Sequence, residues 1–316
     1  MNSRAGKVTA PIVVLILILV TWESLVLVLG IQKFLLPRPS VIVSNLVRVV
    51  VVTPEDLSLD DKAIESELKT EELIIYIPRN SPQALLDKFI PGTFFSIPLG
   101  ATVIYITEGR NLSAIFQASL FTLRGALGGM FIGCTAGVLV AIATARWTAT
   151  RESLMPFAIA VNSMPIIAFA PIMNNWFGID KALSKMAIVA IMVFFPMMIN
   201  TVKGLTLVDG RSLELMRSYA AGEFSILFKL RMPNALPYIF TGLKVAAALS
   251  MIGAIVGEYF GGPRIALGVF ITQEAAMFRF GSAWAAIILA CAIGITLYLI
   301  IVVLERVIMP WHVSFR

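Results

Sequence analysis

Apolar stretches long enough to cross a membrane recur along the whole sequence, separated by shorter polar segments. A helix needs roughly 20 mostly apolar residues to span the hydrocarbon core of a bilayer, because its backbone amides must be satisfied there without water. Six stretches meet this requirement, at about residues 12–30, 112–145, 154–177, 186–202, 236–257 and 283–304. The pattern therefore predicts an all-α integral membrane protein with six transmembrane helices.

The composition strengthens this interpretation. Of the 316 residues, 58% are hydrophobic and 14% are charged, whereas a soluble chain carries about 25% charged residues. So little polar surface excludes an ordinary soluble enzyme, a disordered chain and a disulfide-stapled secreted domain. The two cysteines, Cys134 and Cys291, and the single histidine, His312, supply neither a metal cluster nor a catalytic base. We expect no catalytic residue, no metal and no cofactor.

Lysine and arginine are unevenly divided between the two sides of the predicted spans. Eleven lie in the termini and loops on the side of the termini, and four lie in the opposite short loops. The eleven are Arg4, Lys7, Arg146, Arg151, Lys203, Arg211, Arg217, Lys229, Arg231, Arg306 and Arg316, and the four are Lys181, Lys185, Arg264 and Arg279. Because these residues accumulate in short cytoplasmic loops, we expect a multi-pass protein of the cytoplasmic (inner) membrane with both termini cytoplasmic. The net charge of +6 then reflects topology and indicates no nucleic-acid partner.

Residues 53–110 differ in composition from the rest, with ten acidic against five basic residues. Residues 73–77 and 102–107 are rich in Ile, Val and Tyr, as strands are. Ser58 and Asp61 are spaced to cap a short helix that runs to residue 69, and Pro82 favours the start of a second short helix. We expect a small α+β extracytoplasmic insertion.

The predicted insertion divides the chain into residues 1–52, 53–110 and 111–316. Two other interpretations stay open. The segment is a mobile acidic loop in one of them, and residues 94–107 cross the membrane in the other. A crossing there is disfavoured because the run is short, contains Pro98 and reverses the charge asymmetry of all later loops.

The loop at residues 203–237 carries an apolar face outside the predicted spans. Leu213, Met216, Tyr219 or Ala220, Phe224 and Leu227 recur at helical spacing. This predicts one short helix, which Pro233 and Pro237 end before the fifth span. Such a helix either lies flat on the lipid surface or docks into a groove of a cytoplasmic protein.

At this loop the sequence resembles the inner-membrane permease subunits of ATP-binding-cassette (ABC) importers, in the branch that serves nitrate, sulfonate, taurine and related organic solutes. The family signature is Glu-Ala-Ala, three residues, Gly, nine residues, Ile-x-Leu-Pro. Glu214, Leu215, Met216, Ala220, Leu230 and Pro233 keep this spacing. Bulkier residues replace both alanines and the glycine.

Further resemblances to the family extend over about 250 residues outside the insertion. They comprise Trp22, Glu23, residues 36–40, Leu123, Arg124, Gly128, Pro165, Pro171, residues 176–179, Asp209, residues 241–244, Glu258 and residues 266–268. The resemblance implies a type I importer permease fold with six transmembrane helices. It also implies a function, which is the inward movement of a small organic solute.

The resemblance implies several partners besides the lipid bilayer. The sequence has no GxxxxGK[ST] phosphate loop, so the energy comes from separate ATPase subunits and the chain itself is not an enzyme. A second permease subunit, identical or paralogous, completes the pathway, and an extracytoplasmic solute-binding protein delivers the solute. The insertion is expected to contact one of these last two partners. ATPase coupling is implied for Glu214, Leu215, Met216, Tyr219, Ala220, Phe224, Leu230 and Pro233.

Polar residues within the predicted spans are candidates for the solute pathway. Asn162, Ser163, Asn200 and Ser250 have side chains that hydrogen-bond either a passing solute or a neighbouring helix. Ionisable residues within membrane spans are candidates for functional sites because they are costly to bury in lipid. Here they are Glu23, Arg124, Lys244 and Glu258. Lys244 and Glu258 lie near opposite ends of the fifth span, from which their side chains are expected to reach water.

Two other functions agree less well with the sequence. A stand-alone secondary transporter or channel is the alternative, although such proteins typically show repeats and interrupted helices that are not evident here. A membrane enzyme needs converging acid, base or metal-binding residues, which one histidine and scattered carboxylates do not supply. Among solutes, the uncharged third span favours a neutral aromatic or heterocyclic molecule.

Overall fold

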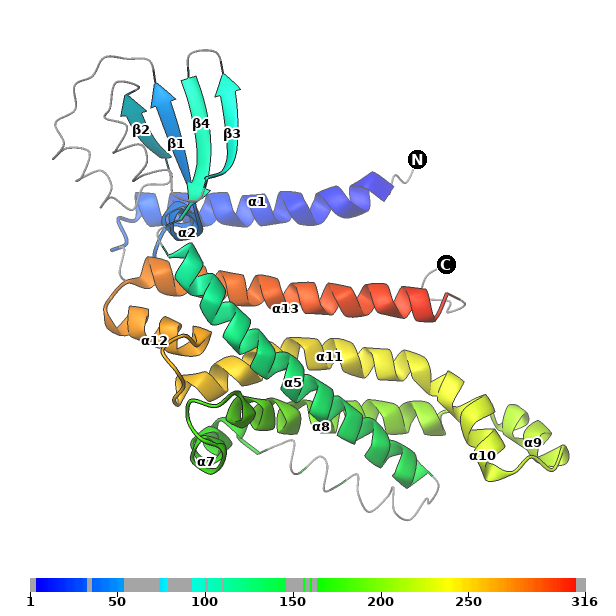
Figure 1. The fold of residues 1–316 in the computed structure, drawn as a ribbon. Helices are drawn as coiled ribbons and strands as arrows, with labels where there is room; N and C mark the ends of the chain where they lie inside the picture. Colours follow the sequence, from blue (N-terminus) through cyan, green and yellow to red (C-terminus); the bar gives the residue numbers. More distant parts are fainter. Residues whose placement is uncertain are drawn as a thin grey trace. The chain divides into compact units, whose positions relative to one another are not determined.

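The computed structural model describes residues 4–32, 36–53, 74–78, 93–99, 102–109, 111–145, 156, 160 and 164–310. The chain divides into two compact units, and each is considered by itself. One comprises Met1–Gln117 with Phe270–Ile288, and the other comprises Ala118–Val269 with Leu289–Arg316. Figure 1 shows the helices and strands in chain order.

The first unit begins with helices α1 (Arg4–Val28) and α2 (Pro39–Leu46). Gly30 ends α1 in the left-handed conformation that glycine adopts without strain, with φ of +60°. The Glu23 carboxylate accepts hydrogen bonds from the Ser40 backbone N–H (3.1 Å) and hydroxyl (2.9 Å). An anion at the first turn of α2 complements the helix dipole. This ionisable residue therefore joins two helices of the first unit.

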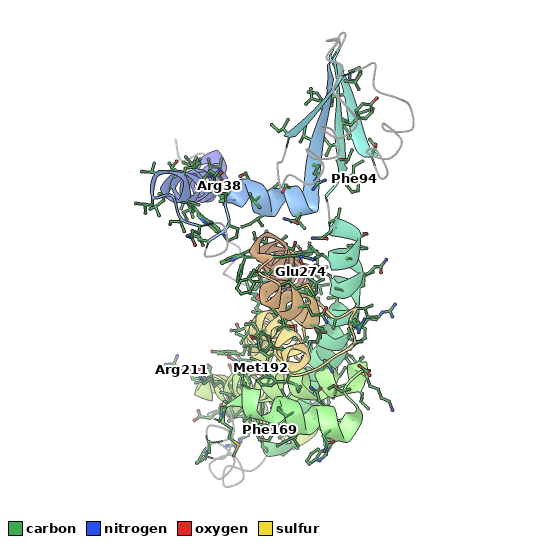
Figure 2. The ribbon with its side chains drawn as sticks, turned by 90° about the vertical axis from the view of Figure 1, so that its left-hand side faces the viewer. Arg38, Phe94, Phe169, Met192, Arg211 and Glu274 are labelled. Atoms are coloured by element: carbon green, nitrogen blue, oxygen red, sulfur yellow. The ribbon has the colours of Figure 1, made fainter. Side chains whose placement is uncertain are left out.

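A four-stranded sheet follows α2, with strand order β2-β1-β4-β3. The strands are β1 (Val47–Thr53), β2 (Ile74–Pro78), β3 (Thr93–Leu99) and β4 (Thr102–Glu108). β1 pairs parallel with β2 and antiparallel with β4, and β3 pairs antiparallel with β4. Phe94 on β3 is 60% exposed and is labelled in Figure 2.

The two strands predicted from sequence are present as β2 and β4. Two further strands, β1 and β3, were not predicted, and β1 begins before residue 53. Because β3 and β4 form an antiparallel pair, the interpretation of residues 94–107 as a membrane crossing is wrong. The predicted helices at 58–69 and after Ser81 lie outside the described residues.

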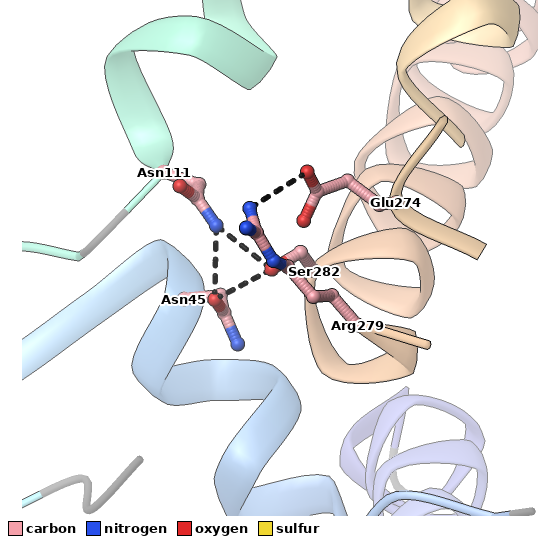
Figure 3. A network of polar contacts seen from close by, with 5 residues as sticks. All are labelled: Asn45, Asn111, Glu274, Arg279 and Ser282. Atoms are coloured by element: carbon pink, nitrogen blue, oxygen red, sulfur yellow. Dashed lines mark hydrogen bonds and ion pairs between the residues drawn. The ribbon is translucent and has the colours of Figure 1, made fainter. Parts of the chain in front are cut away.

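A polar network connects the residues just before β1 with those just after β4 (Figure 3). The Asn111 side-chain amide donates to Asn45 Oδ1 (3.2 Å) and to Ser282 Oγ (2.8 Å). The Ser282 hydroxyl donates to Asn45 Oδ1 at 3.1 Å. Gly109 lies so close to the backbone of Asn45 and Leu46 that a Cβ atom there would overlap it. The chain therefore enters and leaves the sheet at neighbouring positions, which are hydrogen-bonded to each other and to the start of α13 (Phe280–Ile308).

Four helical segments are long and apolar enough to cross a membrane among the described residues. They include α5 (Leu112–Ala145), α8 (Ala182–Thr206), α11 (Met232–Tyr259) and α13. These match the second, fourth, fifth and sixth predicted spans. The described apolar part of α1 is shorter, at Ile16–Val28.

The third predicted span is described only from residue 164 in its second half, apart from residues 156 and 160. That half contains a 3-10 turn at Ile166–Phe169 and the short helix α7 (Ala170–Phe177). The protein is thus mostly helical with four described candidate spans, and the count of six stays a prediction.

Within the second unit, α5 packs closely against α8 through glycines at every fourth position. A Cβ atom added at Gly129 would lie 2.5 Å from Val189 Cβ, and one at Gly133 would lie 2.5 Å from Val193 Cγ2. At Gly137 it would lie 2.8 Å from the Phe194 carbonyl oxygen. Small residues allow this close backbone approach, which is how membrane helices commonly associate.

Candidate functional site

The loop between α8 and α11 forms a compact helical projection. It contains α9 (Gly210–Ser218), the single turn α10 (Glu223–Ile226) and a π-helical turn at Leu227–Arg231 that leads into α11. Figure 1 shows α9 and α10 beyond the ends of α8 and α11, at the opposite end of this unit from α7. Asp209 caps α9, since its carboxylate accepts from the Ser212 backbone N–H at 3.4 Å.

α9 ends in a Schellman motif, so the prediction of a single helix through residue 227 is wrong. The Ala221 N–H donates to the Met216 carbonyl (3.1 Å) and the Ala220 N–H donates to the Arg217 carbonyl (2.9 Å). Ala220 has a φ of +52°, the left-handed conformation that this motif requires. The family signature has glycine at this position, and the geometry explains that preference. The predicted apolar face is therefore divided between two helical segments.

Replacing Ala220 with glycine is expected to stabilise the loop by about 1 kcal/mol, because glycine adopts a positive φ without a Cβ penalty. The same change at Ala221, which does not have a positive φ, is expected to be neutral or destabilising. The melting temperatures of the two variants in detergent measure the difference. A lower melting temperature for Ala220→Gly than for Ala221→Gly contradicts the strained cap.

The prolines do not end the helix, which corrects a second prediction. The backbone stays helical from Glu223 to Tyr259, through Pro233 and Pro237. Pro233 lies in the first turn of α11, where the missing N–H costs little. The π-helical turn lies just before it, and the Met232 N–H donates to the Leu227 carbonyl. The wider π-helical turn accommodates the prolines without interrupting the helix.

Four large apolar side chains within residues 210–231 of this projection are more than half exposed. The exposed fractions are 56% for Leu215, 76% for Tyr219, 73% for Phe224 and 63% for Phe228. We call these four the outer apolar residues. On the inner side, Ile226 is 2% exposed, and Leu227 packs on a buried cluster that includes Leu205 and Ala235. The projection thus has one side in the core and large apolar groups without cover on the other.

The structure distributes the eight predicted coupling residues over both sides. Leu215, Tyr219 and Phe224 are exposed together with Glu214, Ala220 and Pro233, and Met216 and Leu230 are half-buried. Phe228 was missed from the sequence, although it lies one helical turn after Phe224. That spacing was the available signal.

Two of the predicted pathway residues hydrogen-bond to their own helices. The Asn200 amide donates to the Pro196 carbonyl at 2.8 Å, and the Ser250 hydroxyl donates to the Ala247 carbonyl at 2.9 Å. Neither bond reaches another helix. Asn162 and Ser163 lie outside the described residues.

Glu258 does not reach water, contrary to prediction. Its residue is 1% exposed, and Oε2 accepts hydrogen bonds from the Thr122 hydroxyl and the Gly268 backbone N–H, both at 2.9 Å. The Thr122 hydroxyl oxygen in turn accepts from the Leu267 N–H at 3.1 Å. These contacts satisfy the free amides at the start of α12 (Leu267–Ala276).

Lys185 is a second buried charge that sequence reasoning misplaced in a loop. It lies within α8 and is 0% exposed. Its ammonium donates to Asn174 Oδ1 (3.1 Å), to Ser184 Oγ (3.1 Å) and to the Ile179 carbonyl. The available signal was its spacing of three and four residues from buried Ile188 and Val189.

The other ionisable candidates in the second unit differ in their surroundings. Lys244 on α11 pairs with Glu305 on α13, with 2.5 Å between Nζ and Oε2. The Lys244 side chain is 23% exposed. Its ammonium is therefore paired with a carboxylate and only partly accessible to solvent. Arg124 is exposed.

Comparison with known proteins now assigns the class. Residues 133–310 match the family described as binding-protein-dependent transport system inner membrane component. The chain belongs to this family, that of the permease subunits of ABC importers. The match covers the projection, the four outer apolar residues and the buried charges Lys185 and Glu258.

Similar proteins are named as transport permeases. The formylaminopyrimidine transport permease protein ThiX of Halalkalibacterium halodurans is 31% identical, over 70% of this chain and 88% of that protein. The riboflavin transport system permease protein RibX of Chloroflexus aurantiacus is 30% identical, over 66% and 76%. The taurine transport system permease protein TauC of Escherichia coli is 24% identical, over 65% and 74%. The resemblance to the nitrate, sulfonate and taurine branch is thereby confirmed.

Proposed function

We propose that this chain is the transmembrane subunit of an ATP-driven importer, which moves a small organic solute inward after a binding protein delivers it. Separate ATPase subunits drive it through the projection of α9 and α10. In this proposal the chain has six transmembrane helices in the type I arrangement, both termini in the cytoplasm of a cell with an inner membrane, and an extracytoplasmic insertion at residues 53–110. A second permease subunit, identical or paralogous, completes the pathway.

The observation that carries the proposal is the exposure of the outer apolar residues at the end of a capped, partly buried projection. Large exposed apolar groups mark interaction sites, and aromatic side chains dominate binding energy at interfaces. Arg211, Glu214 and Arg217 on α9 are also exposed, and Figure 2 labels Arg211. Apolar anchors beside charges of both signs suit a protein groove better than a lipid surface, which favours a basic polar face.

The proposal predicts that the outer apolar residues hold the ATPase. In the double variant Tyr219→Ala/Phe224→Ala, the ATPase subunit of the same transport system is expected to bind about tenfold or more weakly. Affinity is measured with both proteins co-expressed and purified in detergent. The matched control is Phe131→Ala, since Phe131 is 74% exposed on α5 but lies far along the chain from the projection.

Two results contradict the proposal. Binding of the ATPase by the double variant as tightly as by the control shows that the projection is not the docking site. Solute flux through vesicles that contain the chain without an ATPase favours the alternative, a stand-alone transporter or channel.

For the solute, we propose a neutral heterocyclic molecule. Two of the relatives with about 30% identity are named for formylaminopyrimidine and for riboflavin, and the taurine permease is less similar. Vesicles that contain the complete complex and take up labelled riboflavin test this, with unlabelled taurine as competitor. Competition by taurine contradicts the proposed solute class and leaves the importer assignment unaffected.

A further inference from the structure

One side chain connects the end of α8 to the start of α11, the two helix ends between which the projection lies. The Asn234 amide nitrogen donates to the Gly204 carbonyl and to the Leu207 carbonyl, both at 2.9 Å. Asn234 lies in the first turn of α11, and its two acceptors lie at the end of α8. The last carbonyls of a helix lack partners within that helix. Asn234 therefore supplies, from α11, the cap that α8 does not supply itself.

The backbones of the two helices are in direct contact at the same point. A Cβ atom added at Gly204 would lie 2.7 Å from Ala235 Cα and 2.9 Å from Tyr238 Cβ. Leu205 and Ala235 are both 0% exposed. The contact leaves no room for a side chain at Gly204, so α8 and α11 meet closely where the projection begins and ends.

Local sequence pattern does not account for Asn234. The polar groups of Asn200, Thr201, Thr206 and Thr241 all bond to carbonyls of their own helices. Asn234 bonds across a gap of 27 and 30 residues instead. Its amide is the group that ties one span to the next at the base of the projection.

We infer that Asn234 is a positioning residue for energy coupling, which fixes the ends of α8 and α11 to each other so that a displacement of α9 and α10 moves both helices together. This inference rests on the proposed function. The projection transmits its displacement to both helices only if the end of α8 and the start of α11 do not slide against each other. Without the two hydrogen bonds, sliding between α8 and α11 absorbs part of the displacement.

The test uses Asn234→Leu, which keeps the side-chain size and removes the donors, and Asn234→Asp, which keeps the shape and presents acceptors to two carbonyls. The matched control is Thr241→Val, because the Thr241 hydroxyl donates only within α11, to the Pro237 carbonyl at 2.9 Å. Each full chain is assembled with its ATPase subunits in lipid nanodiscs. Hydrogen exchange is then measured along α8 and α11, with and without ATP and vanadate.

In the unsubstituted chain and the control, trapping with ATP and vanadate is expected to change exchange in α8 and α11 together. In both Asn234 variants the ATPase still binds, and the change in α8 is expected to be about fivefold smaller. A change equal to the control, or loss of ATPase binding in either variant, overturns the inference. Absence of ATPase binding by the unsubstituted chain overturns the proposed function, and the inference with it.

Discussion

Replacing Glu258 with leucine is expected to destabilise the protein by about 1–3 kcal/mol, the cost of leaving a buried backbone donor without its acceptor. The Thr122 hydroxyl and the Gly268 N–H both donate to Oε2; in the leucine variant the Thr122 hydroxyl keeps the Ala118 carbonyl as acceptor (3.1 Å), whereas the Gly268 N–H loses its acceptor. Buried donors without acceptors cost the full penalty of leaving water.

The melting temperature in detergent measures this loss, and a fall of about 5 °C is expected. The matched control is Glu258→Gln. Glutamine keeps one oxygen for Thr122 and Gly268, and its nitrogen replaces Oε1, which has no hydrogen-bond partner in the part of the chain described. If the leucine and glutamine variants have the same melting temperature, the hydrogen bonds to Glu258 contribute little to stability.

The second large effect is expected from Gly133→Leu, which separates α5 from α8. The first added carbon already overlaps the Ala190 carbonyl oxygen and lies 2.5 Å from Val193 Cγ2. Neither can yield easily, because one is backbone and the other belongs to a residue that is 0% exposed. Overpacking a core costs typically 1–3 kcal/mol, and a rigid backbone contact raises the expected loss to about 3 kcal/mol or more.

The matched control is Thr135→Leu, since Thr135 is exposed on the same helix and the substitution introduces the same side chain. Thermal melting and the yield of monodisperse protein after size-exclusion chromatography compare the two variants. Equal stability of Gly133→Leu and Thr135→Leu would mean that α5 and α8 do not approach each other as the structure has it.

The long helices were accessible from the sequence because lipid imposes a length and a composition on every crossing. The predicted span at 112–145 matches α5 at both ends, and α8, α11 and α13 contain the fourth, fifth and sixth predicted spans. The loop at residues 203–237 was also accessible, because Glu214 and Pro233 keep the family spacing. Its internal geometry was not, since the break at Ala220 depends on a positive φ that alanine rarely adopts.

The buried charges show the limit of the sequence most clearly. Lys185 and Glu258 lie near the ends of apolar stretches, where one-dimensional reasoning expects a charge to reach water. The fold brings a helix start and a threonine to Glu258 and an asparagine to Lys185 instead, and both groups are hydrogen-bonded within the protein.

The sequence by itself determined the membrane class, the placement of four described candidate spans and the family, because hydropathy and motif spacing act along the chain. Tertiary structure alone decided which polar groups meet, from the Asn234 amide on the end of α8 to the Glu258 carboxylate at the start of α12. Partners of this kind come from residues far apart in the chain, and only the packing of helices determines the distance between them.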